Sequence, residues 1–382
     1  MRPLFIPDNP INYNEKVQLE TLVYQGYDLD KLKRWKSVDK KKMLDTLNNL
    51  INQWIEEGGK VSKQGTVLFK NKSDQANYEQ IFGMLENGNH TWGEARKDLI
   101  NTIGQYCSYC DSPIYSNLHI EHQLPKSFFA NKVFSWGNFL LSCPTCNSAK
   151  GNNPNQATVD KPKILRTEEA IKHIMNEEDL HFYWPKISNN SDRTGSIYPF
   201  VYALKKIGTY RKKPRFEEQL TEQEINELFS KFKSGELYID NGRYYYLKPD
   251  DRTKYFFGIE TIPNPACSES IRQAAAKTIE MASLNKFVKV KDSSKSVDRR
   301  MEMRTRAFFV ARWIREQLID AMLHDDSDIL YPKIMKFSKR TIAATGFWGI
   351  WFQELGGWTG EEKQQLLQSC LPGTNPKYWL DN

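Results

Sequence analysis

The sequence predicts an α+β protein, a mainly helical chain with an embedded cysteine-rich metal module and a small β-hairpin in its C-terminal region. Three observations predict this class. Apolar residues recur at helical spacing over several long segments. Two CxxC pairs are separated by 32 intervening residues, a pattern typical of a metal-stapled module. Between residues 237 and 247, apolar and polar residues alternate on both sides of Asn241-Gly242, which indicates a hairpin turn.

The helical pattern predicts six helices, at residues 13–58, 74–86, 167–176, 221–234, 297–322 and 334–355. A cluster of aromatic residues lies near the end of the chain. Because a helical stripe of aromatic side chains is usually buried, we expect this cluster to be core rather than a base-stacking platform. Its members are Phe347, Trp348, Trp351, Phe352 and Trp358.

The chain divides into three predicted regions. Residues 1–97 form a helical N-terminal region, residues 98–155 the cysteine-rich module, and residues 156–382 a mostly helical C-terminal region. Pro154 and the polar stretch around it mark the end of the module. A length of 382 residues suits two or three domains, and a hydrophobic content of 39% predicts buried cores rather than disorder.

The cysteine pattern and the absence of targeting signals predict a cytoplasmic protein with no membrane partner. Four of the six cysteines form the CxxC pairs, which is typical of metal binding in a reducing compartment. The N-terminal residues lack the charged and apolar regions of a signal peptide, and the apolar runs are too short to span a bilayer.

The charge of the chain is mildly basic and unevenly placed. The net charge is +7, which permits a polyanionic partner without requiring one. Residues 98–155 are neutral, with three basic and three acidic side chains, so capture of nucleic acid must fall largely to flanking segments. The candidate phosphate contacts are Lys126 and Lys150 in the module and Lys205, Lys206, Arg211, Lys212, Lys213 and Arg215 beyond it. An ordinary solvated surface is the alternative interpretation of these cations.

The two CxxC pairs predict a structural zinc site. Each CxxC turn can direct two thiolates at one ion, and two such turns complete a tetrahedral shell. The predicted ligands are Cys107, Cys110, Cys143 and Cys146. Because a shell of four sulfurs leaves no open position, we expect this zinc to be structural rather than catalytic.

The residues between and behind the cysteines predict a hydrolytic site. His119, Glu121 and His122 lie between the pairs, and Asn147 directly follows the fourth cysteine. A carboxylate and an amide oxygen are hard ligands that suit Mg²⁺ or Mn²⁺. A neutral His122 beside that ion can take a proton from an attacking water molecule. These residue types together are sufficient for phosphodiester hydrolysis.

This stretch resembles the HNH endonucleases of the zinc-stapled ββα-metal type. The resemblance implies that His122 is the general base and that Glu121 and Asn147 hold the catalytic ion. It implies that Asn138 positions the loop that carries His122 and that His119 has a supporting role near the metal. Lys150-Gly151 completes the CNxxKG ending of the family. Most HNH proteins have Asp where this chain has Glu121, and the longer side chain can alter the metal geometry.

The segment from His119 to Lys126, together with Trp136-Gly137-Asn138, resembles one branch in particular. This branch comprises the HNH proteins of Septu-type and retron-linked antiphage systems, which act beside an ATPase subunit. The resemblance covers about 50 of the 382 residues. It implies a DNA-cleaving defence effector. Two alternatives stay open, a zinc module that binds nucleic acid or a partner without catalysis, and a nuclease that cleaves RNA such as tRNA.

Overall fold

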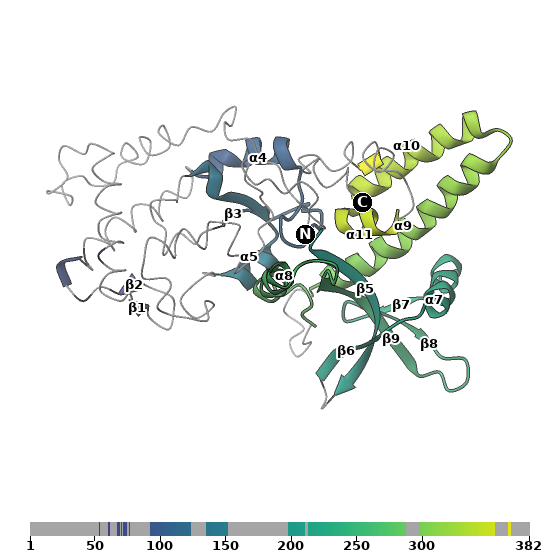
Figure 1. Cartoon of the computed structure of the whole chain (residues 1–382), viewed down its shortest axis with the longest axis horizontal. Coiled ribbons are helices and arrows are strands. Elements are labelled where there is room, and N and C mark those ends of the chain that lie inside the picture. Colours follow the sequence, from purple (N-terminus) through teal and green to yellow (C-terminus); the bar gives the residue numbers. More distant parts are fainter. Residues whose placement is uncertain are drawn as a thin grey trace. The chain divides into compact units, whose positions relative to one another are not determined.

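The computed structural model describes residues 92–123, 135–151, 198–210, 213–287, 298–355 and 366–367, with isolated positions between 53 and 76. These residues fall into two compact units. One contains residues 103–117 and the described residues from 198 onward, and the other contains residues 118–151 and those before 103. Helices and antiparallel sheets occur together, which confirms the predicted α+β class (Figure 1).

The first unit is built on a five-stranded antiparallel sheet of order β6-β5-β9-β8-β7. Its strands are β5 (Phe200–Tyr210), β6 (Lys213–Gln219), β7 (Tyr238–Asp240), β8 (Arg243–Leu247) and β9 (Lys254–Pro263). The predicted hairpin is confirmed as β7–β8. Asn241 and Gly242 join these strands with φ values of 52° and 72°, the backbone that a type I′ turn requires.

The other three strands of the sheet were not predicted. In β5, two consecutive lysines interrupt the alternation of apolar and polar residues that identifies a strand. Both lysines pair with glutamates of the neighbouring strands in the folded chain, which the sequence pattern does not reveal.

The helices of this unit are α7 (Glu222–Ser234), α8 (Glu269–Met281), α9 (Arg300–Leu323), α10 (Ser327–Thr345) and α11 (Trp348–Glu354). The predicted helices at 221–234 and 297–322 are confirmed as α7 and α9. A capping box starts α7, in which Thr221 Oγ1 accepts from the Glu224 amide at 3.3 Å and the Glu224 carboxylate accepts from the Thr221 amide at 2.8 Å.

The single helix predicted at 334–355 is wrong, because the chain forms two helices there. Gly346 ends α10 with φ 68° and ψ −149°, a backbone that is essentially restricted to glycine, and Phe347 follows at φ 59°. Asp111 holds the break, since its carbonyl accepts from the Phe347 amide at 2.9 Å and its carboxylate accepts from the Trp348 amide. Phe347, Trp348 and Trp351 are buried, as predicted for the aromatic cluster, whereas Phe352 is half-buried and Trp358 lies outside the described residues.

α9 is attached to β9 through buried polar groups. The Arg304 guanidinium donates to the Thr261 hydroxyl and to the Leu284 carbonyl, and the Ile259 amide donates to Thr305 Oγ1 at 3.0 Å. Burial lowers the pKa of Arg304 to about 10, with a further contribution from the nearby positive charge of Arg300. These bonds fix α9 along the part of β9 that lies beyond its pairing with β8.

The second unit contains a compact ββα arrangement. Its elements are β3 (His119–His122), a short 3-10 turn η3 (Trp136–Asn138), β4 (Phe139–Ser142) and α5 (Pro144–Lys150). Earlier in the chain, β1 (Lys60–Val61) and β2 (Val67–Leu68) form a two-stranded sheet. They are followed by the 3-10 turn η1 (Trp92–Glu94) and by α4 (Ala95–Ile103). The last residue of α4 falls in the first unit.

Three of the predicted helices fall on parts of the chain that the structure does not describe. The helices at 13–58, 74–86 and 167–176 lie outside the described residues, apart from positions 53, 74 and 76. Among the described residues, no helix combines the length and the apolar character that crossing a bilayer requires.

Substitution of Gly346 tests the break between α10 and α11. A Cβ at Gly346 would lie 2.6 Å from the Asp111 carbonyl oxygen, in a backbone region that other residues do not adopt. We expect Gly346→Ala to lower the free energy of unfolding by about 3 kcal/mol or more in chemical denaturation.

The matched control is Gly235→Ala, at the C-terminus of α7. Gly235 also has a positive φ, of 78°, but nothing lies within 4 Å of its would-be Cβ. We expect a loss of about 1 kcal/mol there. Equal effects of the two variants would contradict the described contact with Asp111.

Candidate active site and metal centre

The β3–β4 hairpin carries the predicted catalytic residues at its closed end. Glu121 pairs with Leu140 and His122 with Phe139 in an antiparallel register. His119 begins the strand and is exposed, whereas Glu121 and His122 at its end are only 5% and 8% exposed. The strand β3 therefore begins in solvent at His119 and ends with its acid and its imidazole buried inside the ββα arrangement.

The segment around Asn138 fixes the end of β3. The amide of Gln123, the residue after His122, donates to the Asn138 carbonyl at 2.8 Å. Asn138 is itself buried, and its amide donates to the Ser135 carbonyl at 2.9 Å. A backbone bond on the C-terminal side of His122 thus continues the strand pairing by one residue and restricts the position of the imidazole.

The imidazole of His122 packs against its cross-strand neighbour. The ring of Phe139 lies 5.3 Å from the His122 ring, centroid to centroid, at an interplanar angle of 82°. Phe139 is fully buried, so its ring is itself held in place. This edge-to-face contact restricts the rotation of the imidazole, which is what a positioned proton acceptor requires.

Lys150 joins the end of α5 to the end of β3. Its Nζ lies 2.6 Å from Glu121 Oε1 and donates to the His122 carbonyl at 2.8 Å. Lys150 is 1% exposed, so both charges of the pair are removed from water. Burial raises the pKa of Glu121 while Lys150 opposes that rise, and burial lowers the pKa of Lys150 while Glu121 opposes that fall.

The sequence did not reveal this ion pair. Lys150 was predicted as a phosphate contact, but its ammonium is directed at Glu121 inside the fold. A signal was available in the spacing, because Lys150 lies three residues after Asn147 and both therefore share one side of a helix. Asn147 lies about one turn before Lys150 on α5, and it is half-buried.

The four predicted zinc ligands lie together. The sulfur atoms of the four cysteines are all within 4.8 Å of one another, and all four residues are buried. Four sulfurs at the usual Zn–S distance of about 2.3 Å are about 3.8 Å apart in a tetrahedron. The arrangement therefore fits a structural zinc ion, held by Cys107, Cys110, Cys143 and Cys146.

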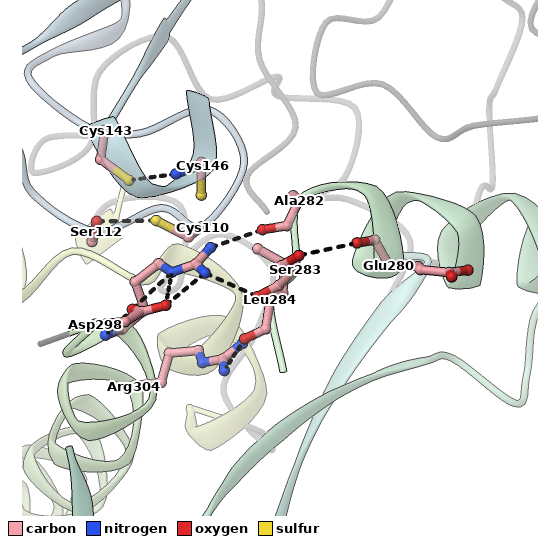
Figure 2. Close-up of polar contacts among 11 residues, drawn as sticks. Cys110, Ser112, Cys143, Cys146, Glu280, Ala282, Ser283, Leu284, Asp298 and Arg304 are labelled. Atoms are coloured by element: carbon pink, nitrogen blue, oxygen red, sulfur yellow. Dashed lines mark hydrogen bonds and ion pairs between the residues drawn. The ribbon is translucent and has the colours of Figure 1, made fainter. Parts of the chain in front are cut away.

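Local hydrogen bonds shape each CxxC turn. In the first turn, the Cys107 amide donates to the Ser112 carbonyl at 2.9 Å, and the Asp111 amide to the Cys107 carbonyl at 2.8 Å. In the second turn, the Cys146 amide donates to Cys143 Sγ at 3.4 Å (Figure 2). Cys143 is also the N-cap of α5 and Pro144 its first residue, so the metal site and the start of this helix are one structure.

The predicted donor set, Glu121 with Asn147, suits a hard divalent ion in its chemistry. It comprises one buried carboxylate and the amide of Asn147, with His122 adjacent in sequence. Among the described residues, His119, Glu121 and His122 do not bring their ligand atoms together as the four cysteines do. An ion at Glu121 would thus rely on waters and substrate oxygens for the rest of its shell, and it would share or displace the ammonium of Lys150.

The predicted nucleic-acid contacts differ in their surroundings. Lys205 pairs with Glu260 at 2.7 Å, and Lys206 lies 3.3 Å from Glu218 and 3.6 Å from Glu217. Lys213 is exposed at the start of β6. The remaining candidates, Lys126, Arg211 and Lys212, lie outside the described residues.

The comparisons with known proteins agree with the site. Residues 107–153 match the family model of the HNH endonucleases, which confirms the resemblance predicted from the cysteine and His-Glu-His motifs. The chain is also 33% identical, over 101 residues, to the Septu protein PtuB of Bacillus thuringiensis. This alignment covers 24% of the chain and 38% of the relative, so the chain spans about two fifths of the protein that it matches. No solved structure gives a significant match.

Replacement of a clustered cysteine tests the zinc site. We expect Cys143→Ser to abolish the zinc that copurifies with the wild-type chain, measured by elemental analysis, and to destabilise the module, because three thiolates and a hydroxyl form a weaker shell. Cys267→Ser is the control, since Cys267 is a buried cysteine outside the cluster. Zinc retained by Cys143→Ser, or absent from the wild type, would contradict the assignment.

Removal of Lys150 tests the buried ion pair. We expect Lys150→Met to lower the free energy of unfolding by about 3–5 kcal/mol near neutral pH, because the Glu121 carboxylate is left buried without a cation. Without Lys150, the pKa of Glu121 rises further above its unfolded value. The deficit should therefore be largest at alkaline pH and should shrink as the pH falls and Glu121 takes up a proton.

The double variant Glu121→Gln with Lys150→Met is the control for this pair. It removes both charges, so we expect it to recover part of the stability that Lys150→Met loses. A double variant that is destabilised by the sum of the two single effects would show that the two side chains are not coupled.

Proposed function

We propose that this chain is a metal-dependent endonuclease that hydrolyses phosphodiester bonds, with DNA as its substrate. The observation that carries the proposal is the pair of buried residues Glu121 and His122 at the end of β3, inside the segment that matches the HNH endonucleases. The buried position and the contact with Phe139 favour an imidazole that is held for proton transfer rather than one that moves freely in water.

In the proposed reaction, His122 takes a proton from the water molecule whose oxygen attacks the phosphorus atom. Glu121 and Asn147 would hold a Mg²⁺ or Mn²⁺ ion, and such an ion would supply stabilisation of the charge that develops on the scissile phosphate and on the leaving oxygen. Asn138 holds the backbone beyond His122 and so keeps the imidazole aimed at the water. His119, two residues before Glu121 and on the same face of β3, would have a supporting role near the ion.

We further propose that the chain is an antiphage defence effector. The similarity to a Septu protein supports this role, and the resemblance of the motifs to the Septu branch implies an ATPase subunit as a partner. We propose a cytoplasmic location on the basis of the cysteine pattern. In this proposal residues 98–155 are the nuclease module, and residues 1–97 and 156–382 supply substrate capture and partner recognition.

Cleavage by a base variant tests the proposed activity. We expect wild-type protein to nick or linearise plasmid DNA with Mg²⁺ or Mn²⁺, and His122→Ala to be at least about 100-fold slower, the usual effect of losing a general base. His324→Ala is the matched control, because His324 is exposed and lies outside the module. Equal cleavage by wild type and His122→Ala would refute the assignment of the base.

Parallel reactions decide between the proposal and its alternatives. EDTA at a concentration that leaves the thiolate zinc bound should stop cleavage. Cleavage of tRNA but not of DNA would make the chain an RNA nuclease. Activity in cells that survives Glu121→Ala but is lost in Cys143→Ser would favour a zinc module that binds without cutting.

A further inference from the structure

Helix α10 is attached to the segment that contains the first CxxC pair. The Tyr106 hydroxyl donates to the Ala343 carbonyl at 2.6 Å. The Tyr115 hydroxyl donates to the Ala344 carbonyl at 2.8 Å. Both tyrosines belong to residues 103–117, which lie in the same compact unit as α10. The C-terminal end of α10 is therefore held against the start of the stretch that matches the HNH endonucleases.

The solvent side of α10 carries three cations. Lys333, Lys336 and Arg340 are all exposed. At about 100° per residue, they lie within about 60° of one another around the helix axis. The two residues of α10 that are buried, Ser338 and Ile342, lie on the other side of the helix. The three cations thus form one exposed surface, which we define as the basic face of α10.

The basic face contains no acidic side chain. Within the described part of the chain, its three cations take part in no ion pair or hydrogen bond, whereas Lys206 and Lys233 lie 3.3 and 3.1 Å from glutamates. Residues 329–345 contain four Lys or Arg and no Asp or Glu. The acids of the α9–α10 connection gather where α9 ends and α10 begins, at the other end of α10 from the tyrosine contacts (Figure 1). They are Asp320, Asp325, Asp326 and Asp328.

The cations lie close to the attached end of the helix. At a rise of about 1.5 Å per residue, they begin about 5 Å from Ala343 and extend to about 15 Å from it. Duplex DNA carries one negative charge per about 1.7 Å of its axis, so the span of about 10 Å between Lys333 and Arg340 corresponds to about six phosphates. A face without acids attracts this density of charge, and the attachment to residues 103–117 keeps it near the first CxxC turn.

We propose that the basic face of α10 binds the phosphate backbone of duplex DNA and that α10 acts as an arm, which holds the substrate near the first CxxC turn. The inference rests on the proposed function only in taking DNA as the ligand. It assigns substrate capture to a helix whose cations were not among the predicted phosphate contacts. Contacts to phosphates carry no sequence information, so the arm binds DNA of any sequence.

Binding by a catalytically inactive chain tests the arm. In the His122→Ala background, we expect the arm variant, which combines Lys333→Gln, Lys336→Gln and Arg340→Gln, to weaken binding to a short labelled DNA duplex roughly tenfold or more. The slope of log affinity against log salt concentration should fall by about 0.9 for each lost phosphate contact. Binding to a second duplex of unrelated sequence should be weakened to the same extent.

The matched control removes three cations that face acids elsewhere in the same unit. It combines Lys231→Gln, Lys233→Gln and Lys254→Gln in the same background, and the ammonium groups of these lysines lie 3.0 to 3.9 Å from carboxylate oxygens. We expect this control to bind DNA like the parent, because the charge of each lysine is already offset locally. Thermal unfolding confirms that both triple variants are folded.

Three outcomes would overturn the proposal. These are equal binding by the arm variant and its parent, equal weakening by the control, and weakening that is confined to one of the two duplexes. In the first case, the exposed Phe337 beside the cations would assign this side of α10 to a protein partner instead. Because binding is measured without cleavage, a failure of the arm is distinct from a failure of the nuclease. Wild-type cleavage that depends on His122 would stand even if the arm variant bound normally.

Discussion

The ion pair between Glu121 and Lys150 is the interaction on which the ββα arrangement depends. One ammonium group holds the Glu121 carboxylate and the His122 carbonyl, and so attaches the last residue of α5 to the last two residues of β3. Neither charge could remain buried alone, because the desolvation of an unpaired ion costs several kcal/mol. The strand and the helix are therefore coupled, and a group that displaces Lys150 must bring its own positive charge.

Two further constraints complete this arrangement. Cys143 caps α5 and is one of the four clustered thiols, so the metal site fixes the start of the helix whose end carries Lys150. The backbone bond between Gln123 and Asn138 fixes the chain just beyond His122. Residues 98–155 carry no net charge, so a nucleic-acid partner would be attracted mainly by cations outside them.

The sequence revealed the parts of this structure that depend on local chemistry. Each CxxC pair, the Asn241-Gly242 turn and the helix at 221–234 is indicated by residues that are near one another in the sequence. It could not reveal the partner of Lys150, because that contact depends on how α5 lies against β3. The break at Gly346 was missed for the same reason, since Asp111, which holds it, is more than 200 residues away in the sequence. Strand β5 was missed because its charges are offset across the sheet.

The most direct test of the central claim is to locate a divalent ion relative to Glu121. Anomalous scattering from crystals of the whole chain, grown with Mn²⁺ and a DNA duplex, would identify that ion by element. The account predicts a manganese peak within bonding distance of Glu121 and Asn147, with the His122 imidazole facing the scissile phosphate and Lys150 displaced or sharing the carboxylate. A manganese peak elsewhere, with the Glu121–Lys150 pair intact beside bound DNA, would contradict it.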